Sequence, residues 1–245
     1  GRRPYLALRL ESPMMSFGGV AVDEHGVTSA SPGTSMLTGL IANALGYRHG
    51  DEKMLNRLQE RLRYATRRDR AGEHLVDYQT VDLGQAYLTE GWTTFHRPAK
   101  RAGGTAKTGT HIRRRHYWAD ASFVVVLEVV PPEEEPTLNT IAEALNKPAR
   151  PLFLGRKMCI PSRPVFAGHV EAEGLDGALY EVPVDRRNDG EFLSVWVPSD
   201  DRSSGAHEDL ETVVSDMRDW ANQVHTGRRR VLHGIRSFRM ERDEQ

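Results

Sequence analysis

The residues best suited to chemistry in this sequence form a run of cations with no acid among them. Between Gly91 and Ala119 the chain carries seven Lys or Arg residues and neither Asp nor Glu. They are Arg97, Lys100, Arg101, Lys107, Arg113, Arg114 and Arg115. Because the whole chain has a formal charge of −1, the remainder carries −8, and this basic window is a local excess. Like charges repel, so we expect either a polyanion or bulk solvent to face the window.

Aromatic rings and glycines are interleaved with these cations. The rings belong to His96, His111, His116, Tyr117 and Trp118. Phosphates attract cations, while unpaired bases stack on aromatic rings and guanidinium planes. A protein that reads double-stranded DNA usually presents a recognition helix, and the window has no helical pattern. It therefore predicts binding to single-stranded or irregular RNA, with a flexible surface loop as the alternative.

Two further loops have residue types that suit phosphate binding. Ser16, Phe17 and Gly18 follow the first predicted strand, and Gly155, Arg156 and Lys157 precede a later one. Glycine-flanked loops can present backbone N–H groups and cations to phosphates. The loop at Gly155–Lys157 is equally compatible with an ordinary strand connection, and on sequence alone we interpret Ser16–Gly18 as an ordinary strand-exit loop, with a groove lining as the alternative.

The window also holds the residue types of metal-independent RNA cleavage. His111, His116, Tyr117 and Lys107 could supply a general base, a general acid and cationic stabilisation. No His, Cys or carboxylate cluster has metal-ligand spacing, so we expect neither a metal nor a cofactor. Since no geometry is fixed by these residue types, an endoribonuclease remains the alternative to a non-catalytic RNA-binding protein.

Bulk properties favour a protein of a reducing, aqueous compartment. The chain has 245 residues and a single cysteine, Cys159, so no internal disulfide can form. No apolar run reaches the roughly 20 residues of a membrane span. The first residues lead directly into a strand pattern rather than a secretory signal. We expect a cytoplasmic protein with no membrane partner.

Hydrophobic periodicity predicts an α+β chain. Tyr5–Leu10 alternates as a half-buried strand, and Ser122–Val130 reads as a strand buried on both faces. Helices are expected after a cap at Thr34 or Ser35, ending at Gly46, and after Asp51 and Thr137. Further strands are expected at 64–69, 75–81, Val165–Glu171, Leu179–Val184, Phe192–Val197 and Val231–Met240, with a helix or long connection at Glu208–Val224. The order suggests a ferredoxin-like or RRM-like sandwich.

Several stretches together resemble a known family. They are LRLESPMMSFG at 8–18, SMLTGLIANALG at 35–46, DYQTV at 77–81, RRHYWADASF at 114–123 and LGRKMCIPSRP at 154–164. In this order they resemble the CasD family of the RAMP superfamily, whose members cap the 5′ end of the guide RNA (crRNA) in type I-E CRISPR Cascade.

The resemblance implies a fold, a role and partners. The fold would be an RRM-like RAMP domain over 1–170 with a thumb β-hairpin inserted at about 84–118, and a β-rich C-terminal extension over 171–245 packed on the same body. The partners would be the crRNA 5′ handle, the backbone subunit CasC and the large subunit CasA, with target DNA reached only through the assembled complex. The thumb residues Arg97–Arg115 and the two loops would hold the handle for antiviral defence. Relatives in another subtype cleave the precursor RNA themselves, which keeps the endoribonuclease open, as does a purely structural assembly role.

Overall fold

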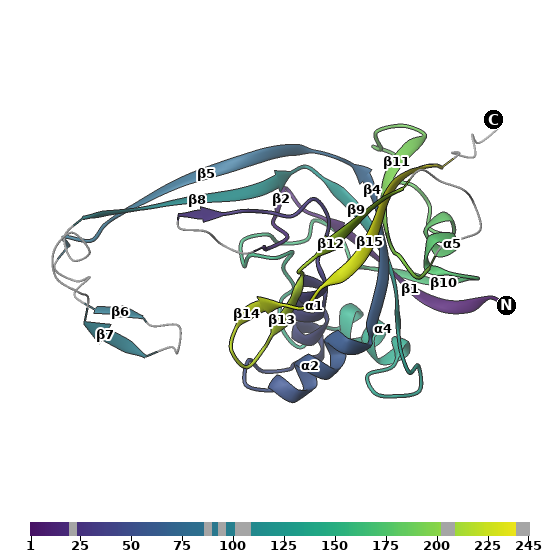
Figure 1. Cartoon of the computed structure of the whole chain (residues 1–245), viewed down its shortest axis with the longest axis horizontal. Helices are drawn as coiled ribbons and strands as arrows, with labels where there is room; N and C mark the ends of the chain where they lie inside the picture. The colour runs from purple at the N-terminus through teal and green to yellow at the C-terminus, as the bar shows by residue number, and fades with distance from the viewer. Residues whose placement is uncertain (20–23, 86–89, 93–96, 101–108, 202–208, 239–245) are drawn as a thin grey trace.

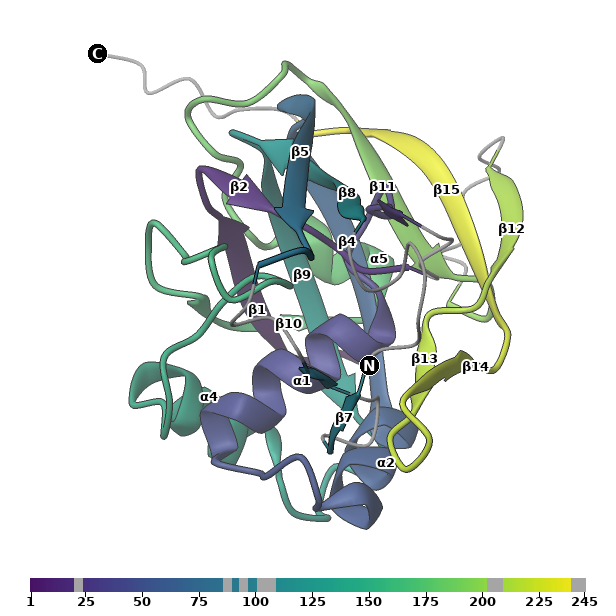
Figure 2. The same cartoon turned by 90° about the vertical axis from the view of Figure 1, so that its left-hand side faces the viewer.

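The structure is a computed structural model, and it describes residues 1–19, 24–85, 90–92, 97–100, 109–201 and 209–238. The predicted α+β class is confirmed: one seven-stranded antiparallel sheet carries helices on both faces (Figures 1 and 2). The strands follow the order β10-β1-β9-β4-β11-β15-β12. Their bounds are β1 Arg3–Glu11, β4 Leu62–Arg70, β9 Ser122–Val129, β10 Phe166–Ala172, β11 Phe192–Pro198, β12 Leu210–Val214 and β15 Arg229–Ser237.

The centre of the sheet is buried on both faces. Every residue of β9 is buried, as its β-branched composition predicts. The expectation that Tyr5–Leu10 is buried on one face only is wrong, because all six of its residues are buried. Helices α1 (Thr34–Leu45), α2 (Glu52–Arg61) and α4 (Leu138–Asn146) cover one face, and α5 (Leu175–Tyr180) covers the other. Figure 2 looks onto the face that α1 crosses.

The helix ends differ from expectation at the start of α1. Gly46 ends this helix in the left-handed conformation, with φ 85°, as expected. Neither Thr34 nor Ser35 caps its start: the N-cap is Gly33, without a side-chain bond. Instead Asp216, remote in sequence, accepts a hydrogen bond from the Thr34 N–H at 3.0 Å. By contrast Thr137 caps α4 as predicted, accepting from the Thr140 N–H.

Two expectations in the C-terminal half are wrong. Leu179–Val184 is not a strand, since α5 ends at Tyr180 and packs against β4 and β9. Glu208–Val224 is neither a helix nor a plain connection. Its described residues contain β12 and then β13 (Met217–Asp219), which pairs with β14 (Val224–Thr226) in a short hairpin.

A long two-stranded hairpin extends beyond the sheet (Figure 1). Its strands are β5 (Glu73–Asp82) and β8 (Thr110–Ala119), paired from Glu73↔Ala119 to Asp82↔Thr110. On its other edge β8 pairs with the short strands β2 (Met14–Met15) and β3 (His25–Gly26). Near the tip, β6 (Glu90–Trp92) pairs with β7 (Pro98–Lys100).

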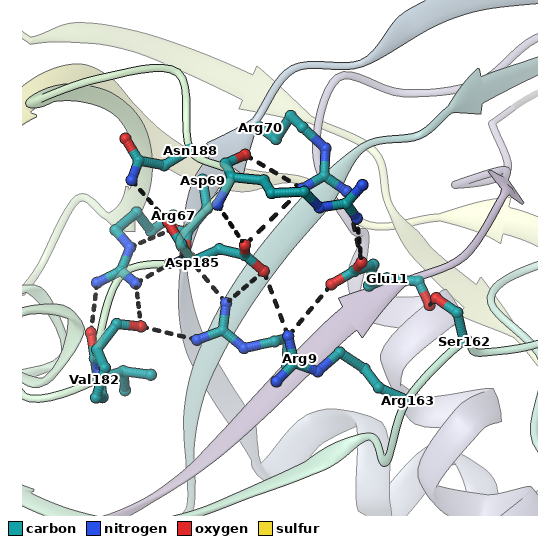
Figure 3. Close-up of polar contacts among 12 residues, drawn as sticks. Arg9, Glu11, Arg67, Asp69, Arg70, Ser162, Arg163, Val182, Asp185 and Asn188 are labelled. Carbon is teal, nitrogen blue, oxygen red and sulfur yellow. Dashed lines mark hydrogen bonds and ion pairs between the residues drawn. The ribbon is translucent and has the colours of Figure 1, made fainter.

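A buried ion network fastens the sheet to the chain that follows α5 (Figure 3). Asp69 accepts from the guanidinium groups of Arg9 at 3.1 Å and Arg67 at 2.5 Å, and from the Asp185 N–H at 2.9 Å. The side chains of Arg67 and Asp69 are fully buried. The charge around Asp69 is therefore paired within the fold.

No helix in the described ranges is long and apolar enough to cross a membrane.

Candidate nucleic-acid interface

The two loops predicted from sequence lie against each other. The Ser16 N–H donates to the Leu154 carbonyl oxygen at 3.2 Å. Gly155 has φ 95°, and a Cβ on it would overlap the backbone of Ser16. Such close approach of two backbones requires glycine. Two loops more than 130 residues apart in the sequence, Ser16–Gly18 and Gly155–Lys157, thus form one continuous rim on the surface.

Phe17 does not line that rim. Its side chain is fully buried and meets Phe123 edge-on, with ring centroids 5.0 Å apart. The prediction of Phe17 as an RNA contact is therefore wrong for its side chain. Ser16 is also buried, with its hydroxyl donating to the His116 carbonyl oxygen at 3.1 Å, whereas Gly18 is exposed.

Arg156 holds the second loop to the base of the β5–β8 hairpin. Its guanidinium donates to the carbonyl oxygens of Gly26 at 2.9 Å and His116 at 3.1 Å, and it lies 4.6 Å from the Tyr117 ring centroid. Tyr117 is fully buried, and its hydroxyl contacts the Met158 sulfur at 3.1 Å. Tyr117 is thus a packing residue, and its side chain is not accessible for the RNA contact predicted from the sequence. Lys157 and Gly155 are exposed.

A cavity of about 490 Å³ opens beside these loops. The loops, α1 and the β13–β14 hairpin form its walls. Among the described residues that line it, none is acidic, while Arg48, Arg150, Arg156 and Arg218 supply cations. Aromatic side chains come from Tyr47, Phe153 and Trp220. A pocket of this size with several cations and rings suits an anionic ligand that carries a ring.

The arginines of β8 alternate between two environments. Arg114 forms an ion pair with Glu24 and lies over the Tyr78 ring at 5.5 Å, so a partner beyond the basic window neutralises it. Arg115 and His111 are exposed, and Arg113 is half-buried. Neighbouring residues of a strand point to opposite faces, so Arg113 and Arg115 lie on one face of the hairpin and Arg114 lies on the other.

Of the remaining predicted cations, Arg97 and Lys100 lie toward the tip of the hairpin. Arg97 is exposed, and Lys100 is the last residue of β7. Arg101 and Lys107 lie outside the described residues.

A histidine cluster at the base of the hairpin was not predicted as a group. His116 Nδ1 lies 3.0 Å from His74 Nε2, and the His25 ring lies 5.9 Å from that of His116. Burial lowers the pKa of His116, and the charges of His74, His25 and Arg156 lower it further. Only the β5–β8 register, in which Val76 faces His116, brings His74 near it. In the part of the chain that the structure describes, no three His, Cys, Asp or Glu residues are grouped to hold a metal.

Three comparisons agree on the relatives of this chain. Residues 5–232 match a family described as CRISPR-associated protein (Cas_Cas5). The Escherichia coli (strain K12) protein "CRISPR system Cascade subunit CasD" is 31% identical over 180 residues, which cover 72% of this chain and 76% of that protein. A chain of a "CRISPR RNA-guided surveillance complex" is similar with a TM-score of 0.67 and 26% identity, covering 96% of this chain and 90% of its own. A second solved structure, "Crystal structure of Cas protein", has a TM-score of 0.62 and 26% identity over 94% of each chain.

Proposed function

The chain belongs to the Cas5 family of CRISPR-associated proteins, and we propose that it is the Cascade subunit that caps the 5′ handle of crRNA. The observation that carries this proposal is the acid-free cavity at the meeting point of the two predicted loops. RNA offers phosphates for the arginines and unpaired bases for the rings. The proposed site of action is the cytoplasm.

The sheet and the long hairpin support the finer parts of this assignment. Strands β1, β4, β9 and β10 are the first, second, third and fourth strands of a β-α-β-β-α-β chain. In the sheet they lie in the order β10-β1-β9-β4, which is 4-1-3-2. We assign a ferredoxin-like core on that order and identify the β5–β8 hairpin as the thumb. The face of this thumb that carries half-buried Arg113 and exposed Arg115 would follow the RNA backbone.

The same hairpin supports contact with a protein neighbour. β5 exposes Leu75, Val76, Tyr78 and Val81, each more than 40% accessible. Apolar side chains gathered on a projecting ribbon are typical of surfaces that are covered on assembly. The backbone subunit CasC is the partner we assign to them, with CasA docking nearby and target DNA reached only through the complex.

A second candidate function is cleavage of precursor crRNA. It is favoured by the His74–His116 pair, because a neutral imidazole near a cation can exchange protons with a ribose hydroxyl. We nevertheless propose a non-catalytic role, since the cavity explains RNA binding without a reacting group.

One experiment separates the two functions. The purified chain is mixed in EDTA with end-labelled crRNA carrying its 5′ handle and, separately, with uncut repeat RNA. A native gel reads retention and a denaturing gel reads cleavage. Retention of the handle RNA without cleavage is the expected result. Cleavage at one repeat position, lost in His116→Gln and in His74→Gln, would replace the capping role by processing.

A further inference from the structure

Two histidines meet on one face of the long hairpin, near its base. In the β5–β8 register His74 faces Trp118 and His116 faces Val76, so the two histidines are diagonal neighbours on the same face. His74 Nε2 lies 3.0 Å from His116 Nδ1. The two residues are 42 positions apart in the sequence, so no ligand spacing in the sequence could indicate that they act together.

The pair is open to ligands from solution. The His74 side chain is exposed, and that of His116 is half-buried. His116 Nε2 is buried without a partner among the described residues, which leaves Nδ1, on the side of His74, as the nitrogen that can reach a ligand. The exposed His25 ring is centred 5.9 Å from that of His116, and its Nε2 lies 3.9 Å from Glu24 Oε1. Two nitrogens from two different strands therefore converge on one accessible point.

The separation of these nitrogens matches that of two ligands on one zinc ion. Zn–N bonds are about 2.0–2.1 Å long, and at coordination angles of about 90–110° two of them place their nitrogens about 2.8–3.4 Å apart. The observed distance is 3.0 Å. It also fits a hydrogen bond, in which one ring holds a proton between the two nitrogens, and a metal would replace that proton. Imidazole nitrogen suits zinc, copper and nickel, whereas magnesium and calcium take oxygen ligands.

The surrounding charges keep His116 in the form that binds metal. Only a neutral imidazole has a lone pair to offer a metal ion. Burial lowers the pKa of His116, and the charges of its two histidine neighbours and of Arg156 lower it further. The Arg156 guanidinium is directed at backbone carbonyl oxygens, and Arg114, two residues from His116 on the same face, is paired with Glu24. His116 should thus be neutral at pH 7.

We propose that His74 Nε2 and His116 Nδ1 are the two protein ligands of a zinc ion at the base of the hairpin, with water completing its coordination. Water occupies the positions that the protein leaves open on zinc. The ion bridges β5 and β8, and so ties together the two strands of the hairpin where they leave the sheet. The site lies apart from the proposed RNA site, because neither histidine lines the cavity beside the two loops.

The test measures zinc binding to the full chain, without a polyhistidine tag, by isothermal titration calorimetry with zinc chloride at neutral pH. The wild type is compared with His74→Gln, His116→Gln and His169→Gln. Glutamine keeps a polar side chain but has no imidazole. His169 is a matched control because it is an exposed strand histidine on β10, outside the hairpin. Magnesium chloride, titrated into the wild type, controls for attraction by charge alone.

We expect a single zinc site in the wild type and no magnesium binding. Outer-shell changes alone weaken metal binding about 10–100-fold, so loss of either direct ligand should weaken it by more than about tenfold. His169→Gln should bind as the wild type does. Zinc at about ten times its Kd should raise the Tm of the wild type by about 3–6 °C, and that of neither ligand variant. No zinc binding by the wild type, or equal affinity in the wild type and both ligand variants, would overturn the site.

A measurement on the wild-type chain covers the case in which a variant does not fold. Proton–nitrogen NMR spectra of the imidazole rings are recorded with and without zinc chloride. Of the ten histidines, two should shift, one through Nε2 and one through Nδ1. Shifts confined to other histidines would refute the site. Because no RNA is present, the outcome is independent of the capping role, which retention of handle RNA in EDTA tests separately.

Discussion

Gly155 and Ser16 approach so closely that no side chain fits at Gly155. The glycine has φ 95°, and an added Cβ would overlap the Ser16 carbonyl oxygen. The close approach of the two loops that border the cavity therefore requires glycine at position 155, and a single added methyl group would force them apart.

Substitution of this glycine tests that contact. Gly155→Ala should lower the free energy of unfolding by about 1–3 kcal/mol, because it combines backbone strain with a clash. It should also weaken handle RNA binding, since the loop must move away from Ser16. Urea unfolding and anisotropy measure the two effects. Gly50→Ala is the control, because nothing lies within 4 Å of a Cβ there; similar losses in both variants would contradict this account.

Charge reversal on the long hairpin tests its role in RNA retention. Arg113→Glu with Arg115→Glu should weaken handle binding without unfolding the chain, because the backbone ladder of β8 does not depend on these side chains. If each contacts a phosphate, the slope of log K against log salt should become shallower by about 1.4. Lys53→Glu, an exposed residue of α2, controls for net charge. An unchanged slope would remove the hairpin from the RNA interface.

Removal of Asp69 should be strongly destabilising. Asp69→Ala leaves the buried guanidinium groups of Arg9 and Arg67 without their shared carboxylate. Breaking a buried pair in this way costs about 3–5 kcal/mol. Asp200→Ala, which removes an exposed partner of Arg63, should cost less than about 1 kcal/mol. Urea unfolding followed by tryptophan fluorescence compares them, and equal losses would show that the buried network stabilises little.

Asp216 should make stability depend on acidity. Burial alone would raise the pKa of its carboxyl, but the Arg229 charge and bonds from Arg229, Thr34 and Tyr64 hold that pKa below its usual range. Because the folded-state pKa is depressed, this stabilisation is present above about pH 3.9, the unfolded value, and is lost as pH falls toward the folded value.

Asp216→Asn should therefore lower the free energy of unfolding at pH 7. It should also make that free energy fall less steeply as the pH drops below about 4. Urea midpoints measured across this range give both quantities. Glu60→Gln removes one exposed carboxylate from α2 and should leave the decline parallel to that of the wild type. A parallel decline in Asp216→Asn would contradict a depressed pKa.

Local patterns predicted the parts of this fold that local physics determines. Ser122–Val130 is apolar and β-branched almost throughout, and it is the buried strand β9. Thr137 caps α4 and Gly46 ends α1, because capping depends on a few neighbouring residues.

Tertiary contacts decided what the sequence could not reveal. The stretch at Leu179–Val184 has strand-like residues, yet packing on β4 and β9 makes its first part the end of α5. Phe17 and Tyr117 have the right types for base stacking, but the core buries them. The cavity wall at Arg218 lies some 60 residues from the nearest residue of either predicted loop, so no spacing rule connects them.

The cap on α1 has a consequence for how the chain is made. Ribosomes release the N-terminal strands first, yet the carboxylate that caps Thr34 belongs to Asp216, and the cation that pairs with this carboxylate belongs to Arg229 on β15. A nascent chain can assemble β1, β4 and β9 early, but the contacts that fix the start of α1 and the cavity wall at Arg218 form only after the chain from Asp216 to Arg229 has been made. A product truncated before Asp216 would thus lack both the carboxylate at the start of α1 and the cavity wall at Arg218.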